Sequence, residues 1–231
     1  MRLLNRLIGR AKAVQTASES YQAYAVRSKH AQDQDTALNR IQFLVLDTET
    51  TGLDYKQDHI VSCALVPVND SQIQIRDCME WAVRSSVPSS PTSIRVHGVL
   101  NTELDAGMSE MEFGHQLLRQ MSNEVIVGYH PGFDMAILNR LLKKHHGGAL
   151  GNPVLDIARL VMRLDYPLKP AFLNPEPYSF DRLCKRFHVE ASDRHTAIGD
   201  AYATALLLLR VLEVCRQHGL LSLRELLRPY T

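Results

Sequence analysis

The sequence has few of the features that mark membrane proteins, secreted proteins or disulfide-bonded folds. No apolar run in its 231 residues is long enough to span a bilayer. The amino terminus is interrupted by arginines and lacks the apolar core of a secretory signal. The four cysteines lie far apart and suggest no disulfide framework: Cys63, Cys78, Cys184 and Cys215. We therefore expect a cytoplasmic protein without integral membrane association.

The sequence also lacks an excess of positive charge. Its 26 Lys and Arg residues nearly balance its 25 Asp and Glu residues, which leaves a net charge of +1. Residues 1–40 carry a balance of +4, so residues 41–231 carry −3. This is not the basic surface that drives non-specific binding to nucleic acid. If residues 41–231 handle phosphates, bound cations must supply much of the local positive charge.

The composition changes near residue 40. In residues 1–14, apolar residues recur at helical spacing between basic ones, which predicts a basic amphipathic helix. Such a helix can lie on a membrane or dock a partner, but more often it packs on its own domain. Residues 15–40 are polar and indicate a weak helix or a linker. We expect an N-terminal helix and linker over 1–40, a main domain over 41–215, and a short C-terminal helix or tail over 216–231.

Within the main domain, hairpin-like strands come first, and alternating strands and helices follow. This order predicts an α/β fold with a mixed sheet and helices packed on its faces. Strands are expected at 41–47, 59–68, 72–83, 124–129 and 153–156. Helices are expected near 109–121, 133–145, 156–164, 179–187 and 197–217.

Two carboxylates follow the first apolar strand at positions i and i+2. Side chains alternate along a strand, so Asp47 and Glu49 point to the same face. Two acids at the edge of a core repel each other and lose hydration, and a hard divalent cation such as Mg²⁺ or Mn²⁺ relieves both effects. The alternative is an acidic turn in which Thr50, Thr51 and Gly52 reverse the chain. This segment alone does not decide between them.

Three more polar residues lie next to expected strands and helices. Asp134 falls in the first turn of a helix, and Asp200 falls in an early turn of the long helix that follows His195. Taken singly, each acid is explained by helix capping and the histidine by a surface position. Gly199, at a helix start, indicates close packing or close approach to a ligand. Together with Asp47 and Glu49, these residues form a set of four carboxylates and one base.

The order of these motifs resembles the DEDD superfamily of 3′→5′ exonucleases, in its histidine-bearing branch. The motifs are a strand followed by Asp-Thr-Glu-Thr-Thr-Gly, then Phe-Asp, then His-x-x-x-x-Asp. That branch includes the proofreading epsilon subunit of the bacterial replicative polymerase. The similarity covers most of residues 41–212 and includes three supporting segments, at 95–99, 154–156 and 179–184. The resemblance implies a ribonuclease H-like mixed sheet of five strands flanked by helices, here with an N-terminal helical extension.

The resemblance also implies a two-metal mechanism. Asp47, Glu49 and Asp200 would hold one Mg²⁺ or Mn²⁺ ion, Asp47 would bridge to a second, and Asp134 would support the second. His195 would take a proton from the attacking water, since its unperturbed pKa of about 6.5 leaves a neutral population at physiological pH. The expected reaction removes nucleotides from a 3′ end and releases nucleoside 5′-monophosphates.

The substrate contacts implied by the resemblance are less complete. Thr50, Thr51, Gly52 and Leu53 match the stretch that lies along the terminal nucleotide in the family, and His97 is a further candidate that could equally serve a core or a turn. The second motif departs from the common His-Asn-Ala-x-Phe-Asp, because His130 and its neighbours stand where substrate-facing residues are found. The departure affects contacts to the 3′-terminal nucleotide, not the chemistry.

Several alternatives stay open at this point. DNA is the expected substrate, in proofreading or repair, and RNA trimming is the alternative. A polymerase or another protein could bind the N-terminal helix. Two further hypotheses are that the chain is a catalytically silent exonuclease fold that serves as a binding module, or a zinc protein. The zinc hypothesis depends on the ligand-like spacing of Cys184 with His188 and of Cys215 with His218.

Overall fold

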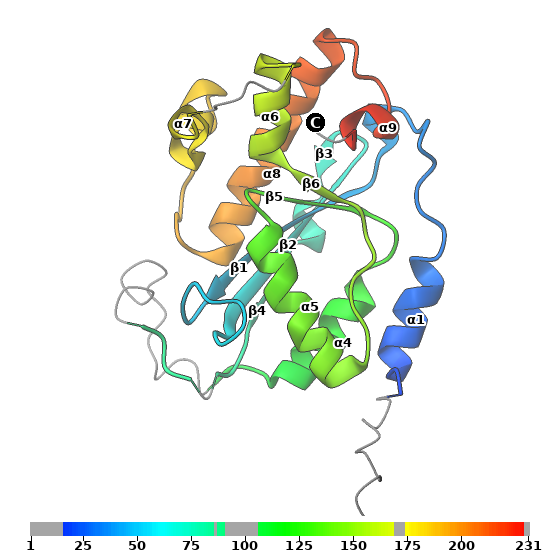
Figure 1. The fold of residues 1–231 in the computed structure, drawn as a ribbon, viewed down its shortest axis with the longest axis vertical. Helices are drawn as coiled ribbons and strands as arrows, with labels where there is room; N and C mark the ends of the chain where they lie inside the picture. Colours follow the sequence, from blue (N-terminus) through cyan, green and yellow to red (C-terminus); the bar gives the residue numbers. More distant parts are fainter. Residues whose placement is uncertain (1–15, 86, 91–105, 169–173, 229–231) are drawn as a thin grey trace, which may run out of the picture.

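A mixed sheet lies at the centre of the protein (Figure 1). The computed structural model describes residues 16–85, 87–90, 106–168 and 174–228. The strand order is β3-β2-β1-β5-β6, and β4 pairs with β2. The strands are β1 Phe43–Thr50, β2 Ile60–Asn69, β3 Gln72–Ile73, β4 Met79–Ala82, β5 Val125–Gly128 and β6 Val154–Asp156. β1 is antiparallel to β2 and parallel to β5, and β5 is parallel to β6, so β1, β5 and β6 end at the same edge of the sheet.

The sheet differs from the expected one in two respects. It has six strands rather than five, because the 3-10 helix η2 (Ile75–Asp77) divides the expected segment 72–83 into β3 and β4. The first strand begins at Phe43 and continues to Thr50, three residues beyond its expected end at Asp47, so Glu49 also lies within it. Pairing with β2 extends β1 through the carboxylates, and the register shifts only between Glu49 and Thr50.

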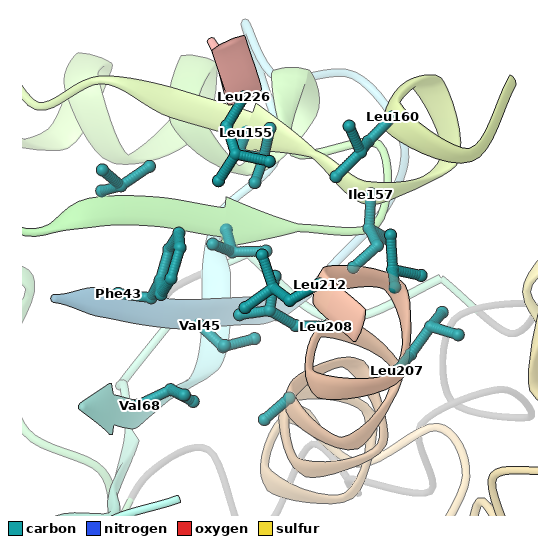
Figure 2. Close-up of a cluster of buried hydrophobic side chains, with 14 of the residues drawn as sticks. Phe43, Val45, Val68, Leu155, Ile157, Leu160, Leu207, Leu208, Leu212 and Leu226 are labelled. Carbon is teal, nitrogen blue, oxygen red and sulfur yellow. The ribbon is translucent and has the colours of Figure 1, made fainter. Parts of the chain in front are cut away.

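Helices cover both faces of the sheet. On one face lie α6 (Ile157–Asp165) and α8 (Ala197–Gln217), packed on Phe43 and Val45 of β1 (Figure 2). On the other face lie α4 (Glu110–Gln120) and α5 (Gly132–His146), which pack on Leu44 and Leu46. Alternate residues of β1 therefore enter two separate apolar cores, as its side-chain period requires. The short α7 (Phe180–Arg186) packs beside α8. All five helices agree with the expected ranges to within two residues.

The segments before and after the sheet also pack on it. Helix α1 (Glu19–Arg27) lies beside α4 (Figure 1), and its Tyr24 is only 1% exposed. The Tyr24 hydroxyl donates a hydrogen bond of 2.6 Å to Asn152 Oδ1. Near the other terminus, α9 (Leu223–Leu226) buries Leu223 and Leu226 in the same core as α8. The basic helix expected within residues 1–14 lies outside the described residues, and the division at residue 40 stays a prediction.

None of the described helices is both long enough and apolar enough to cross a lipid bilayer.

Candidate active site

Three carboxylates meet where β1 and α8 approach each other. Asp47 and Glu49 continue the row of Phe43 and Val45 on the α8 face of β1, and Asp200 lies in the first turn of α8. One carboxylate oxygen from each of these three acids lies within 4.8 Å of the others. All three side chains are half-buried. No other part of the described chain contains such a group of three potential metal ligands.

Asp134 approaches the same strand from the opposite face. It lies in the first turn of α5, and its Oδ1 accepts hydrogen bonds from the Thr48 backbone N–H at 3.1 Å and the Thr48 hydroxyl at 2.5 Å. Thr48 stands between Asp47 and Glu49 and points to the α5 face. The four acids thus surround the carboxyl-terminal end of β1. Three of them lie on the α8 side of the strand and one lies on the α5 side.

The environment of the acids favours their neutral forms. Burial, followed by repulsion from Asp134, Glu49 and Asp200, raises the pKa of Asp47 well above its usual range. Burial and the neighbouring carboxylates raise the pKa of Glu49 to about 8. Burial also raises the pKa of Asp134. The carboxylates of the cluster repel one another, and too little positive charge lies nearby to offset the repulsion. A hard divalent cation would supply that charge, and carboxylate oxygens are suitable ligands for it.

One arginine already supplies part of that positive charge. A guanidinium Nη1 of Arg194 donates to Asp200 Oδ1, and its Nε lies 3.3 Å from Asp181 Oδ1. The guanidinium also lies 4.4 Å from the centre of the Phe180 ring. Arg194 was not predicted from the sequence to belong to the site. Its position next to His195 was the one indication in the sequence that Arg194 lies near the site. No spacing rule shows that its side chain points back toward Asp200.

The loop before α8 holds His195 at the edge of the cluster. The His195 backbone N–H donates to Asp200 Oδ2 at 3.2 Å, and the residue is exposed with a φ of 65°. Asp193 is also left-handed, with a φ of 52°. A Cβ on Gly199 would lie 2.1 Å from the Asp193 carbonyl oxygen, so only glycine lets this loop pack on the start of α8. Close packing therefore explains Gly199.

The predicted nucleotide-facing stretch forms a fixed loop. Thr50 and Thr51 are buried, and the Thr51 hydroxyl donates to Asp58 Oδ1 at 2.9 Å. A Cβ on Gly52 would lie 2.5 Å from Asp58 Oδ2, so a larger residue there would displace the Asp58 side chain. Leu53 is 90% exposed and projects from the loop. Contact of these four residues with a nucleotide stays a prediction.

The two remaining histidines of the predicted site have different outcomes. His97, in the segment 95–99, lies outside the described residues. His130 is left-handed, with a φ of 52°, and its Nδ1 lies 3.3 Å from Asp156 Oδ2 at the end of β6. Its ring centre lies 4.3 Å from that of Tyr129, with the two ring planes tilted by 51°. The structure thus places His130 toward β6, and its role in binding stays a prediction.

The cysteine and histidine pairs do not form a metal site. Cys184 and Cys215 are buried in apolar clusters, and no group of three potential ligands among the described residues includes a cysteine. Burial raises the pKa of both thiols to about 11, which disfavours the thiolate that zinc requires.

Most of the chain is similar to proteins that are already known. A sequence profile of the family described as "Exonuclease" matches residues 44–208. The chain is 31% identical over 179 residues to the PolC-type DNA polymerase III of Bacillus subtilis and 30% identical over 192 residues to a "DNA polymerase III subunit epsilon-like protein" of Rhodobacter capsulatus. These alignments cover 77% and 80% of this chain, but only 12% and 26% of the relatives.

A solved structure shares the fold. Escherichia coli exonuclease I in complex with a dT13 oligonucleotide superposes with a TM-score of 0.64 at 20% identity, over 78% of this chain and 43% of that one. The matched stretch, residues 44–208, contains the five residues of the predicted catalytic set, Asp47, Glu49, Asp134, His195 and Asp200, whose roles stay a prediction. The chain belongs to the exonuclease family.

Proposed function

We propose that this chain is a metal-dependent 3′→5′ exonuclease that releases nucleoside 5′-monophosphates from DNA. The observation that carries the proposal is the meeting of Asp47, Glu49 and Asp200 within 4.8 Å, in a chain of the exonuclease family. DNA is favoured over RNA because the relatives' names refer to DNA polymerase III, and the structural neighbour was solved with a DNA oligonucleotide.

The donor set fits two Mg²⁺ or Mn²⁺ ions. Asp47, Glu49 and Asp200 would hold the first, and Asp47 and Asp134 the second. Ions bound there would supply the activation of the attacking water and the stabilisation of the leaving 3′-oxygen. The protein's own part is to bring four acids to one strand end and to hold them there, with Thr48 fixing Asp134.

His195 is the proposed general base. Its exposed imidazole is free to receive a proton from the attacking water, and the bond from its backbone to Asp200 holds it beside the cluster. The loop from Thr50 to Leu53 would lie along the terminal nucleotide of a single-stranded 3′ end, with the exposed Leu53 against its base.

The test offers 5′-labelled single-stranded DNA, duplex DNA and RNA to the purified chain with Mg²⁺ or Mn²⁺. We expect stepwise shortening of single-stranded DNA from its 3′ end and a 5′-monophosphate product. Asp47→Asn keeps the shape of the side chain and should abolish the reaction without unfolding the protein. Undiminished turnover in EDTA would contradict the metal mechanism, preferential degradation of RNA would favour the trimming alternative, and no turnover on any substrate would favour a silent binding module.

The wider role of the protein is part of the proposal. The chain spans about an eighth to a quarter of the relatives it matches, so association with a polymerase is proposed from their names alone. Residues 1–14 are the proposed contact, because their basic and apolar residues alternate at helical spacing. Deleting residues 2–14 should leave nuclease activity intact and abolish co-purification with the partner. The cytoplasmic location stays a prediction.

A further inference from the structure

A cavity of about 520 Å³ opens beside the carboxyl ends of β5 and β6. Its lining comes from the residues around the start of α5, from β6 and α6, and from the end of α9 and the residues that follow it. None of the residues that line it belongs to the carboxylate cluster. It therefore adds a separate concave surface at the edge of the sheet that carries Asp47 and Glu49.

The lining is strongly basic in a domain that is otherwise acidic. Arg159, Arg163 and Arg228 contribute three positive charges, against the single carboxylate of Asp156. The Arg159 side chain is 76% exposed, and its Nε lies 3.5 Å from Asp156, a long and weak ion pair. Arg228 is exposed and has no ion pair within the described residues. Two of the three guanidinium groups are thus available to an anion.

The third arginine shapes the cavity. Arg163 donates hydrogen bonds to the carbonyl oxygens of Glu225 at 2.9 Å and Leu226 at 3.0 Å, and also to that of Arg228. These bonds attach α9 and Arg228 to α6 and hold Arg228 at the rim. The apolar part of the wall includes Leu226 and Val154. A basic rim over an apolar wall suits a ligand that combines a phosphate with a flat base.

The position of the cavity relates it to the catalytic centre. β1 pairs with β5, and Gly128 at the end of β5 pairs with Asp156 at the end of β6. Neighbouring strands lie about 4.8 Å apart, so the cavity begins roughly 10 Å from the β1 carboxylates along the sheet edge. A strand whose 3′ end lies at Asp47 can reach it within a few nucleotides.

We propose that this cavity is a second nucleic-acid subsite, in which Arg159 and Arg228 bind the phosphates of nucleotides upstream of the scissile one. The inference rests on the proposed exonuclease function. The second subsite predicts that long substrates are preferred over short ones, because only long substrates reach Arg159 and Arg228. Phosphate contacts of this kind release counterions and make binding depend on salt.

The experiment compares two substrates, the 12-mer dT12 and the p-nitrophenyl ester of thymidine 5′-monophosphate, which fills only the terminal position. The double variant Arg159→Gln/Arg228→Gln should lower the ratio of kcat/KM for dT12 to kcat/KM for the ester by about 10-fold. The slope of log kcat/KM for dT12 against log salt should become shallower by about 0.7 per lost phosphate contact.

Arg76→Gln is the matched control. Arg76 is an exposed arginine in η2 next to β3, at the opposite edge of the sheet, and its substitution removes the same charge. It should change neither the ratio nor the slope.

The outcomes separate this inference from the proposed function. If the wild type hydrolyses neither substrate, the proposed function fails. If the wild type hydrolyses both and the double variant keeps the ratio within twofold, the second subsite is wrong and the exonuclease proposal stands. An equal loss on both substrates also overturns the subsite, because it would place the two arginines at the terminal position.

Discussion

At the scale of single residues, Arg194 determines how the carboxylate cluster behaves before a metal binds. The guanidinium donates a hydrogen bond to Asp200, one of the acids that a metal would use. It also forms an ion pair with the exposed Asp181. A cation that binds Asp200 must share it with Arg194 or displace it. Arg194 therefore stabilises the metal-free protein and competes with the metal.

Replacing Arg194 with Gln should have two opposite effects. The metal-free protein should melt at a lower temperature, because repulsion among the acids is no longer offset. The affinity for Mn²⁺, measured by calorimetry, should rise several-fold, because the competing cation has gone. Arg182→Gln on the same helix-loop unit removes an arginine that pairs with Glu176 and should do neither. Weaker Mn²⁺ binding by Arg194→Gln would show that Arg194 supports the metal site instead.

The raised pKa values predict how stability depends on pH. Glu49 has a pKa of about 8 in the folded protein and an ordinary value near 4.5 when unfolded, so the folded state holds the extra proton. Stability from this group is complete below about pH 4.5 and is lost as the pH rises toward 8. The metal-free melting temperature should fall across this range, and Glu49→Gln should flatten the decline. A melting temperature that rises with pH in both proteins would contradict the pKa shift.

His195 should contribute to the rate and not to metal binding. His195→Ala removes the proposed base and should lower kcat by about 10² to 10⁴, the usual range for a general base. Mn²⁺ affinity should stay within twofold, since the residue contacts Asp200 through its backbone N–H, which alanine retains. Calorimetry and single-turnover kinetics check both parts. A large loss of Mn²⁺ affinity would show that the imidazole helps to hold the metal.

The sequence was informative about acids and less so about their partners. Asp47, Glu49 and Asp200 could be placed together because strand alternation and motif order both point to them. The hydrogen bond between Thr48 and Asp134 could not be predicted, because it depends on the position of α5 relative to β1. The hydrogen bond from Arg194 to Asp200 depends likewise on the conformation of the loop before α8. Contacts between elements that are distant in sequence are not encoded in local patterns.

At the scale of elements, β1 and the start of α8 bring together the three acids of the proposed catalytic site. The helices were predicted to within two residues because their apolar residues recur with a clear period. β1 was predicted too short, since pairing with β2 carries it through polar residues that look like a turn. The segment 72–83 was predicted as one strand, since its interruption by η2 has no Gly or Pro to mark it.

The junction of the loop and α8 can be tested at Gly199. Gly199→Ala adds a Cβ where the Asp193 carbonyl lies 2.1 Å away, so the loop carrying His195 must shift. We expect kcat to fall by at least about 10-fold, because small displacements of a catalytic group have large effects. Gly132→Ala, also at a helix start but with no atom within 4 Å of the new Cβ, should leave the melting temperature unchanged or raise it slightly. Full activity of Gly199→Ala would show that the loop tolerates the shift.

At the scale of the whole molecule, the segment before the sheet is part of the fold. Residues 15–40 were expected to be a weak helix or a linker, but α1 buries Tyr24 against the chain near Asn152. Arg27 on the same helix donates to the carbonyl oxygens of Leu118 and Met121 at the end of α4. No local pattern shows such contacts, because the partners lie more than ninety residues away.

Tyr24→Ala should therefore destabilise the protein. Removing a buried aromatic side chain costs about 3–5 kcal/mol, which urea unfolding measures directly. Val26→Ala on the same helix removes an apolar side chain that is 72% exposed, and should change stability by less than about 0.5 kcal/mol. A small effect of Tyr24→Ala would show that α1 docks weakly.

The joining of β1 with α8 also has a consequence for the timing of activity during synthesis. Asp47 and Glu49 leave the ribosome about 150 residues before Asp200 does. A nascent or prematurely terminated chain that stops before residue 195 has two of the three clustered acids and lacks both Asp200 and His195. Under the proposed mechanism, such an incomplete copy has no complete catalytic set.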